Sequence, residues 1–205
     1  MEPHNPSDPD PLRALVAPTL AGDARAANEL LAAVQDRVFN LALRFLGDPE
    51  AARDACQEIC LKVWSKLDTY RGESRFSTWM LAVAGNHLSD SRKSRLEQAG
   101  ISFEAYEAES GVVASPRPLA AGLEEQALAE ELRHSCSLGM LQCLDRTDRL
   151  VYVLQAFFGV SSEEGGLICG LSPAAYRQRL SRVRKKMAAF LASVCGLAGS
   201  RAPCR

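Results

Sequence analysis

The stretch that decides the fold is SSEEGGLICGLSPAAYRQRLSRVRKK, residues 161–186. It opens on Ser161 and two glutamates, a helix N-cap followed by acidic residues that suit the positive end of a helix dipole. Gly170 supplies a tight turn after Cys169. Ser172 then begins a second helix as its N-cap, and the proline after it suits the first helical turn. The stretch therefore predicts a helix, a turn and a second helix.

The second of these helices has one apolar face. At about 100° per residue, its apolar side chains fall within an arc of roughly 60°; they are Tyr176, Leu180, Val183 and Met187. The six basic residues of residues 177–186 lie outside that arc. A helix with one dry face and a cationic remainder suits a DNA major groove, where it neutralises phosphates and contacts base edges. We therefore predict a DNA-binding helix-turn-helix.

The net charge conceals this feature. The 205 residues have a formal net charge of −1, which taken alone argues against a nucleic-acid partner. Residues 62–95 hold seven basic and three acidic residues, residues 101–133 two basic and seven acidic, and residues 161–190 six basic and two acidic. Because the local field attracts a polyanion, the two basic blocks favour a nucleic-acid partner. Solvated helix faces are the alternative for each block on its own.

The chain before this stretch predicts another helical unit, over residues 12–95. Apolar residues at helical spacing end at Gly47, which suits a helix C-cap, and a further helix is expected over residues 50–67. After a polar break, a third helix is expected from Phe76 to about Ser94. Together these helices are expected to form one compact helical domain.

The remaining segments divide the chain. We expect a disordered tail over residues 1–11, which hold four prolines, and a flexible acidic linker over residues 96–122. The helix-turn-helix unit is expected over residues 123–192 and a cysteine-containing tail over residues 193–205. No β alternation of useful length occurs. The predicted fold class is all-α, with two small helical domains joined by the linker.

The cysteines, histidines and apolar runs exclude other classes of protein. The seven cysteines form no Cys-x-x-Cys pair, and the N-terminus has no signal-peptide pattern, so we expect no disulfide framework. Cys56 and Cys60 lie four apart, a spacing that favours core packing over metal binding. The three histidines are scattered, so we expect no enzyme and no cofactor. No apolar run approaches the roughly 18 residues that span a bilayer, which favours a cytoplasmic protein without membrane insertion.

The motifs of both units resemble those of bacterial RNA polymerase sigma factors, in the extracytoplasmic-function (ECF) subfamily of the sigma-70 family. Residues 171–185, LSPAAYRQRLSRVRK, are similar to the recognition helix of the family's region 4. The similarity to region 2 lies in DACQEICLKVW (54–64), LD (67–68), RG (71–72), FSTW (76–79) and AGN (84–86). These motifs follow the family's order, and the similarity covers about residues 12–192.

This resemblance implies a sigma factor that binds the β′ and β subunits of core RNA polymerase, directs it to promoter DNA and aids strand opening, with no catalysis of its own. Polymerase docking is implied for Asp54, Gln57, Glu58 and Leu61. Recognition of the −10 element is implied for Tyr70, Arg71, Arg75, Trp79, Asn86, Arg92 and Lys93, and the loop at residues 69–76 would receive a flipped base. Recognition of the −35 element is implied for Arg177, Gln178, Arg179, Ser181, Arg182 and Lys185. An anti-sigma factor or another regulator is implied as a further partner.

Two features depart from the family's usual pattern. Gly165 and Gly166 lie in the first helix of the helix-turn-helix, where each costs about 1 kcal/mol relative to alanine. We therefore expect a weak or displaced helix, with the bulky Tyr176 filling the space that a glycine leaves. In the C-terminal tail, Cys195 and Cys204 are candidate metal ligands or redox-sensing thiols. Two thiolates alone do not complete a tetrahedral zinc site.

Alternatives stay open for several of these assignments. Trp79 suits core packing as well as base contact, and Glu58 could simply pair with a lysine one turn later on a solvated face. A helix-turn-helix regulator that acts without polymerase, and that responds to metal or redox state through its cysteines, would bind duplex DNA alone. In the linker, we hypothesise that glutamates mimic phosphates inside polymerase channels; the residues concerned are Glu104, Glu107 and Glu109.

Overall fold

The computed structural model describes residues 10–106, 108 and 136–195, and within them it contains helices and turns but no β-strand. The elements are α1 (Pro11–Leu20), α2 (Ala24–Leu46), α3 (Pro49–Ser65), the 3-10 turn η1 (Leu67–Thr69), α4 (Phe76–Asp90), α5 (Arg95–Gln98), α8 (Arg146–Phe158), α9 (Ser162–Cys169) and α10 (Pro173–Val194). The prediction of an all-α fold is confirmed.

Local signals explain where most of these helices begin and end. Asp23 caps α2, Asp48 caps α3 and Ser172 caps α10, each by accepting a hydrogen bond from a backbone N–H of the first turn. Gly47 ends α2 with a φ of 70°, a left-handed conformation that glycine adopts without a steric penalty. Short polar side chains therefore set the helix boundaries, and the apolar stripes set the packing.

Two boundaries differ from those expected. Asp10 caps α1 and Pro11 begins it, so both residues belong to the folded part of the chain rather than to the tail. Helix α4 ends at Asp90 instead of Ser94, because Ser91 leaves the helix with an extended backbone, at φ −66° and ψ 157°. Ser94 caps α5 instead. Arg92 and Lys93 consequently lie on an extended segment and not on a helix, whereas Arg95 begins α5.

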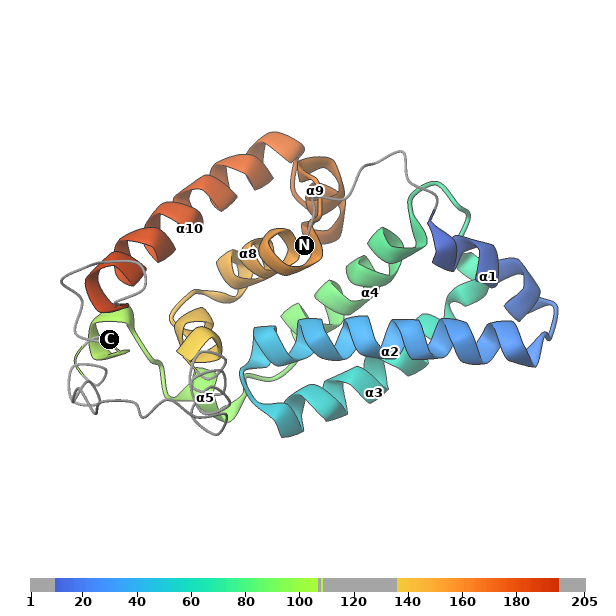
Figure 1. The fold of residues 1–205 in the computed structure, drawn as a ribbon, viewed down its shortest axis with the longest axis horizontal. Coiled ribbons are helices and arrows are strands. Elements are labelled where there is room, and N and C mark those ends of the chain that lie inside the picture. Colours follow the sequence, from blue (N-terminus) through green and yellow to red (C-terminus); the bar gives the residue numbers. More distant parts are fainter. Residues whose placement is uncertain (1–9, 107, 109–135, 196–205) are drawn as a thin grey trace, which may run out of the picture.

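The N-terminal unit consists of α1 to α4 (Figure 1). Helices α2 and α3 pack side by side, and α1 and α4 both pack against α2. The core between them is filled by fully buried side chains, among them Val38, Phe45, Ile59, Phe76 and Met80. These are the residues whose helical spacing marks one apolar face on each helix.

The C-terminal unit, α8 to α10, shares one hydrophobic core with the N-terminal unit. Helix α9 packs on α4, and α8 packs on α2 (Figure 1). At the contact between α4 and α9, a Cβ on Gly85 would lie 3.3 Å from Cγ2 of Ile168. Nearby, the hydroxyl of Thr78 donates to Oε1 of Glu164 at 2.8 Å. The two units therefore pack directly on each other and form one body, which we call closed.

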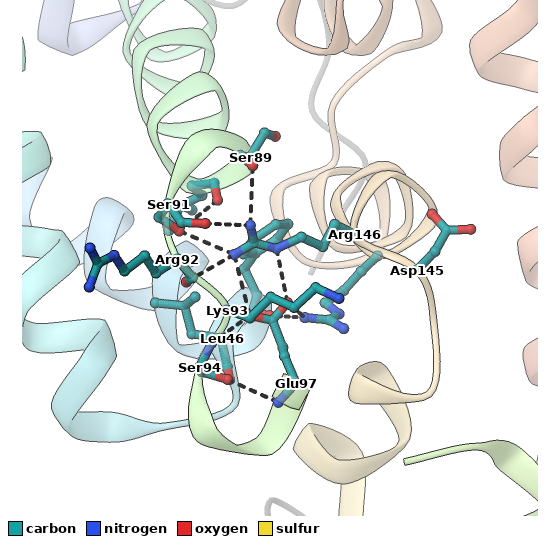
Figure 2. A network of polar contacts seen from close by, with 12 residues as sticks. Leu46, Ser89, Ser91, Arg92, Lys93, Ser94, Glu97, Asp145 and Arg146 are labelled. Carbon is teal, nitrogen blue, oxygen red and sulfur yellow. Dashed lines mark hydrogen bonds and ion pairs between the residues drawn. The ribbon is translucent and has the colours of Figure 1, made fainter. Parts of the chain in front are cut away.

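A buried cluster of charged side chains joins α5 to α8 (Figure 2). The Glu97 carboxylate contacts Nη1 of Arg149 at 2.7 Å and Nε of Arg146 at 3.0 Å. Arg149 also donates to four backbone carbonyls, those of Phe45, Leu141, Gln142 and Leu144. Because Glu97 lies in the segment that we expected to begin the linker, the start of that segment is part of the fold.

Most of the expected linker lies outside the described residues, as do Glu107, Glu109 and residues 123–135 of the expected C-terminal unit, whereas residues 136–142 of that unit are helical. Its described beginning packs on α10: the ring centroid of Phe103 lies 4.7 Å from that of Phe190. The segment after α5 is thus held against the last helix of the C-terminal unit.

Candidate nucleic-acid and polymerase interface

The helix-turn-helix forms at the expected position. Helix α9 starts with a capping box, in which Ser161 and Glu164 each accept a hydrogen bond from the other's backbone N–H. Gly170 then turns the chain with a φ of 64°. Despite its two interior glycines, α9 is a regular helix over Ser162–Cys169, because this capping and the packing on α4 and α10 stabilise it.

Both glycines of α9 are needed for close packing. A Cβ on Gly165 would lie 2.2 Å from Cζ of Tyr176, and a Cβ on Gly166 would lie 2.7 Å from the carbonyl oxygen of Leu171. Tyr176 is fully buried, and its hydroxyl donates to the carbonyl of Val151 at 3.0 Å. The expectation that Tyr176 fills the space left by a glycine is therefore confirmed.

Helix α10 turns most of its predicted −35 residues to solvent. The exposed ones are Arg177, Gln178, Ser181, Arg182 and Lys185, and the apolar stripe that includes Leu180 and Val183 is buried. Arg179 differs, because it is only half-exposed and its Nη1 donates to Oδ1 of Asp148 at 3.0 Å. Five of the six predicted residues are thus exposed, and Arg179 is held by a carboxylate of α8.

The predicted docking residues lie together on the exposed face of α3. Asp54, Gln57 and Glu58 are exposed, and Leu61 is 65% exposed. Trp64, one turn further along, is 45% exposed. The opposite face of α3, with Ile59, packs into the core. A mixed acidic and apolar face that stays exposed in this way suits a protein partner.

A histidine of α4 reaches this face. Nδ1 of His87 lies 2.6 Å from Nζ of Lys62, and its Nε2 lies 3.4 Å from Oε2 of Glu58. Burial and the Lys62 ammonium lower the pKa of His87 below its ordinary value. The contact joins two helices at a sequence separation of 25 residues, so no local pattern in the sequence indicated it.

The predicted −10 loop ends on a cluster of aromatic rings. The ring centroids of Tyr70, Phe76 and Trp79 lie 5.4–5.5 Å from one another. The Tyr70 hydroxyl donates to the carbonyl of Ser74 at 2.7 Å and closes the loop. Trp79 is half-buried and packs against the core, so the core-packing alternative holds for part of its ring.

Cations surround this loop. Arg71 is exposed, whereas Arg75 is half-buried, and its Nε and Nη1 have no hydrogen-bond partner among the described residues. Burial raises the pKa of Glu164, but hydrogen bonds from Ser161 and Thr78 and the nearby Arg75 outweigh it, so the pKa is lowered overall. Aromatic faces with cations beside them are the chemistry that binds unstacked bases.

The remaining predicted −10 residues lie further along α4 and beyond it. Asn86 is exposed on α4, and Arg92 and Lys93 are exposed on the extended segment after it. Arg146 of α8 holds that segment: its guanidinium donates to the carbonyls of Ser89, Ser91 and Arg92 and to the Ser91 hydroxyl (Figure 2). Sequence reasoning missed Arg146, because its partners lie at least 49 residues away.

The cysteines form no metal centre in the described part of the chain. Cys56 and Cys60 lie with their Sγ atoms 4.0 Å apart, and burial raises the pKa of the Cys56 thiol to about 12, which keeps it protonated at neutral pH. Cys195 is half-buried where α10 ends, and Cys204 lies outside the described residues. Within the described ranges, no three His, Cys, Asp or Glu side chains are placed to hold an ion.

Comparison with known proteins explains this combination of surfaces. Residues 30–96 match the family Sigma-70 region 2, and residues 136–187 match Sigma-70, region 4. "RNA polymerase sigma factor CnrH" of Cupriavidus metallidurans is 33% identical over 193 residues, which cover 91% of this chain and 96% of that relative. The chain belongs to the sigma-70 family.

Other sigma factors place it in the ECF subfamily. The "ECF RNA polymerase sigma-E factor" of Escherichia coli K12 is 28% identical over 172 residues, which cover 83% of this chain and 89% of that relative. A longer relative, "Probable RNA polymerase sigma factor RfaY" of Xanthomonas campestris, is 30% identical over 164 residues, 80% of this chain but only 40% of its own length. This sigma factor accordingly acts in transcription initiation, by directing RNA polymerase to promoters.

A solved structure extends the similarity to the arrangement in space. The structure of CnrH in complex with the cytosolic domain of CnrY has a TM-score of 0.61 and 27% sequence identity, and the match covers 87% of this sigma factor and 96% of that chain.

Within the described residues, no helix is long and apolar enough to cross a membrane. Helix α1 lies before the residues that match region 2.

Proposed function

We propose that this sigma factor docks on core RNA polymerase through α3 and reads promoter DNA with the −10 loop and α10. Asp54, Gln57, Glu58 and Leu61 would form the docking face. The observation that carries the proposal is that the α3 face and the cationic face of α10 are both left exposed by the fold, although their opposite faces are fully packed. Core polymerase supplies the catalysis, and this chain supplies contacts only.

The two DNA-reading surfaces would have different tasks. Arg177, Gln178, Arg182 and Lys185 would contact phosphates and base edges of the duplex −35 element. The loop with Tyr70, beside Arg71, Arg75, Trp79 and Asn86, would receive an unstacked base of the −10 element, and Arg92 and Lys93 would contact the duplex backbone. Opening costs a few kcal/mol per unstacked base, so stacking faces and cations must compensate for it.

The closed body must open during this process. Elements centred about 25 base pairs apart lie roughly 85 Å apart along B-DNA, at 3.4 Å per base pair. A compact body of this chain length has a radius of gyration of only about 17 Å. We propose that docking on core polymerase separates α9 from α4, so that the two units reach the two promoter elements.

A regulator that binds the free factor is also proposed. The structural relative CnrH was solved in complex with the cytosolic domain of CnrY, and a second structural match is a sigma factor in complex with an anti-sigma factor. These likenesses support an anti-sigma partner for this chain as well. Such a partner would compete with core polymerase for the same factor.

The docking proposal is tested by co-elution with core polymerase and by run-off transcription. Leu61→Glu places a charge on the proposed docking face, and Leu20→Glu makes the same change at a site 53% exposed on α1. Because exposed leucines contribute little to folding, we expect both variants to fold. We expect Leu61→Glu to weaken core binding about tenfold or more and Leu20→Glu to leave it unchanged. Equal binding by the two variants would refute docking through α3.

A further inference from the structure

The helix that carries the −10 residues is capped by a side chain from the other end of the unit. Arg75, at the N-cap position of α4, makes no capping hydrogen bond. Instead, the backbone N–H of Phe76 donates to Oδ2 of Asp10 at 2.6 Å, across 66 positions in the sequence. The other carboxylate oxygen, Oδ1, accepts from the backbone N–H of Leu12 at 3.2 Å. A single carboxylate thus caps both α1 and α4.

Helix α1 also contacts the middle of the loop that leads into α4. Gly72 has a φ of 73°, and a Cβ there would lie 2.9 Å from Nη2 of Arg13, so the Arg13 guanidinium lies directly against the loop backbone. Asp10 secures the end of the loop at Phe76, and Tyr70 closes it internally. The loop is therefore held at two points by the first turn of α1.

We propose that Asp10 is a positioning residue for promoter opening: its carboxylate holds residues 70–76 in the conformation that receives an unstacked base. The inference rests on the proposed function of this loop. A loop ordered before it binds loses less conformational entropy when the base arrives, so binding is stronger. A carboxylate at the start of α4 also interacts favourably with the helix dipole.

The other aspartate caps of the N-terminal unit provide the contrast. Asp23 accepts from the backbone N–H groups of Arg25 and Ala26, both in the first turn of its own helix. Asp10 is different, because one of its two carboxylate oxygens accepts a hydrogen bond from the first residue of α4. Helix α4 carries proposed DNA-binding residues. If Asp10 is merely structural, the same substitution at Asp10 and at Asp23 should reduce promoter opening equally. If Asp10 positions the loop, the substitution at Asp10 should reduce promoter opening more.

The test compares Asp10→Ser with Asp23→Ser in the full chain with core polymerase. Serine remains a good N-cap for the helix that it begins, but its single, shorter oxygen cannot serve both Leu12 and Phe76. Promoter opening is followed by the fluorescence of 2-aminopurine in the −10 element, on an intact promoter and on one that is abasic at the flipped position. We expect Asp10→Ser to reduce opening roughly fivefold on the intact promoter, the loss of one capping hydrogen bond. Asp23→Ser should change it less than twofold.

The abasic promoter separates positioning from general damage. Without the base the loop has nothing to receive, so wild type and Asp10→Ser should open this promoter equally. An equal loss on both promoters, or equal effects of the two variants, would overturn the inference. Amide hydrogen exchange of residues 70–76 in the free chain should also become faster in Asp10→Ser, and unchanged exchange would overturn the inference by itself. A different result would refute the proposed function of the loop instead: faster amide exchange in Asp10→Ser, together with wild-type protein that opens the intact and the abasic promoter equally well.

Discussion

Oε1 of Glu97 accepts a hydrogen bond from Nη1 of Arg149 at 2.7 Å, and both side chains are only 3% exposed. This ion pair joins α5, where the residues that match region 2 end, to α8, which lies within the residues that match region 4. The guanidinium of Arg149 also donates hydrogen bonds to backbone carbonyls of α2 and of the segment before α8. Because every charge in the pair has partners, the pair is tolerated in the core, and losing one partner is costly.

Replacing Arg149 should therefore destabilise the free factor strongly. Arg149→Met leaves the Glu97 carboxylate buried beside a single arginine and leaves several carbonyls without donors, so we expect a loss of about 3–5 kcal/mol in the free energy of unfolding. Urea denaturation measures it. Arg182→Met, on the exposed face of α10, is the matched control and should change stability by less than about 0.5 kcal/mol. A similar small change in both variants would contradict the buried network.

The contact between Gly165 and Tyr176 predicts a compensating pair of substitutions. Gly165→Ala places a Cβ inside the van der Waals radius of the Tyr176 ring, so we expect a loss of about 1–3 kcal/mol from overpacking. Adding Tyr176→Leu should relieve the clash, so that the double variant is more stable than the sum of the two single effects predicts. Thermal unfolding of the four proteins gives the coupling energy. Strict additivity would show that the ring does not limit position 165.

The contacts of His87 predict a dependence of stability on pH. Its pKa in the folded chain lies below the ordinary value of 6.5, because burial and Lys62 disfavour the charged form. Neutral His87 is therefore favoured by folding, and its contribution is present above about pH 6.5 and lost as the pH falls through the folded pKa. We expect the urea midpoint of wild type to fall between pH 7.5 and pH 5 more steeply than that of His87→Gln. Parallel curves for the two proteins would contradict this assignment.

The sequence predicts those features of the fold that depend on residues close together along the chain. Serine caps, glycine turns and apolar stripes place the end of α2 and the bounds of α3, α9 and α10 close to those observed, whereas the start of α2 at Ala24 was not predicted. Gly165 and Tyr176 could also be paired in advance, because a fixed turn brings their helices together. The second role of Asp10 and the partners of Arg146 could not be predicted, because these contacts join groups at least 49 residues apart. Of the candidate site, the exposed faces followed from helical periodicity, but the closed packing of α9 on α4 did not.

The proposed opening predicts that a covalent link between the units prevents transcription. In Gly85→Cys/Ile168→Cys, the new sulfurs lie within reach of a disulfide, because a Cβ at position 85 is 3.3 Å from the side chain of residue 168. We expect the oxidised double variant to lose at least about tenfold in run-off transcription with core polymerase, and reduction to restore it. Each single variant, treated in the same way, controls for the native cysteines. Full activity of the oxidised form would show that the units need not part.

The central claim is that this sigma factor recognises promoters as a subunit of RNA polymerase and not as a free regulator. The most direct measurement is DNase protection of one promoter by the factor alone, by core polymerase alone and by the two together, at the same salt concentration. We predict protection of both the −35 and −10 regions, with the −10 bases becoming unpaired, only when both proteins are present. Equal protection of duplex promoter by the factor alone, unaffected by core polymerase, would contradict this account and favour an independent helix-turn-helix regulator.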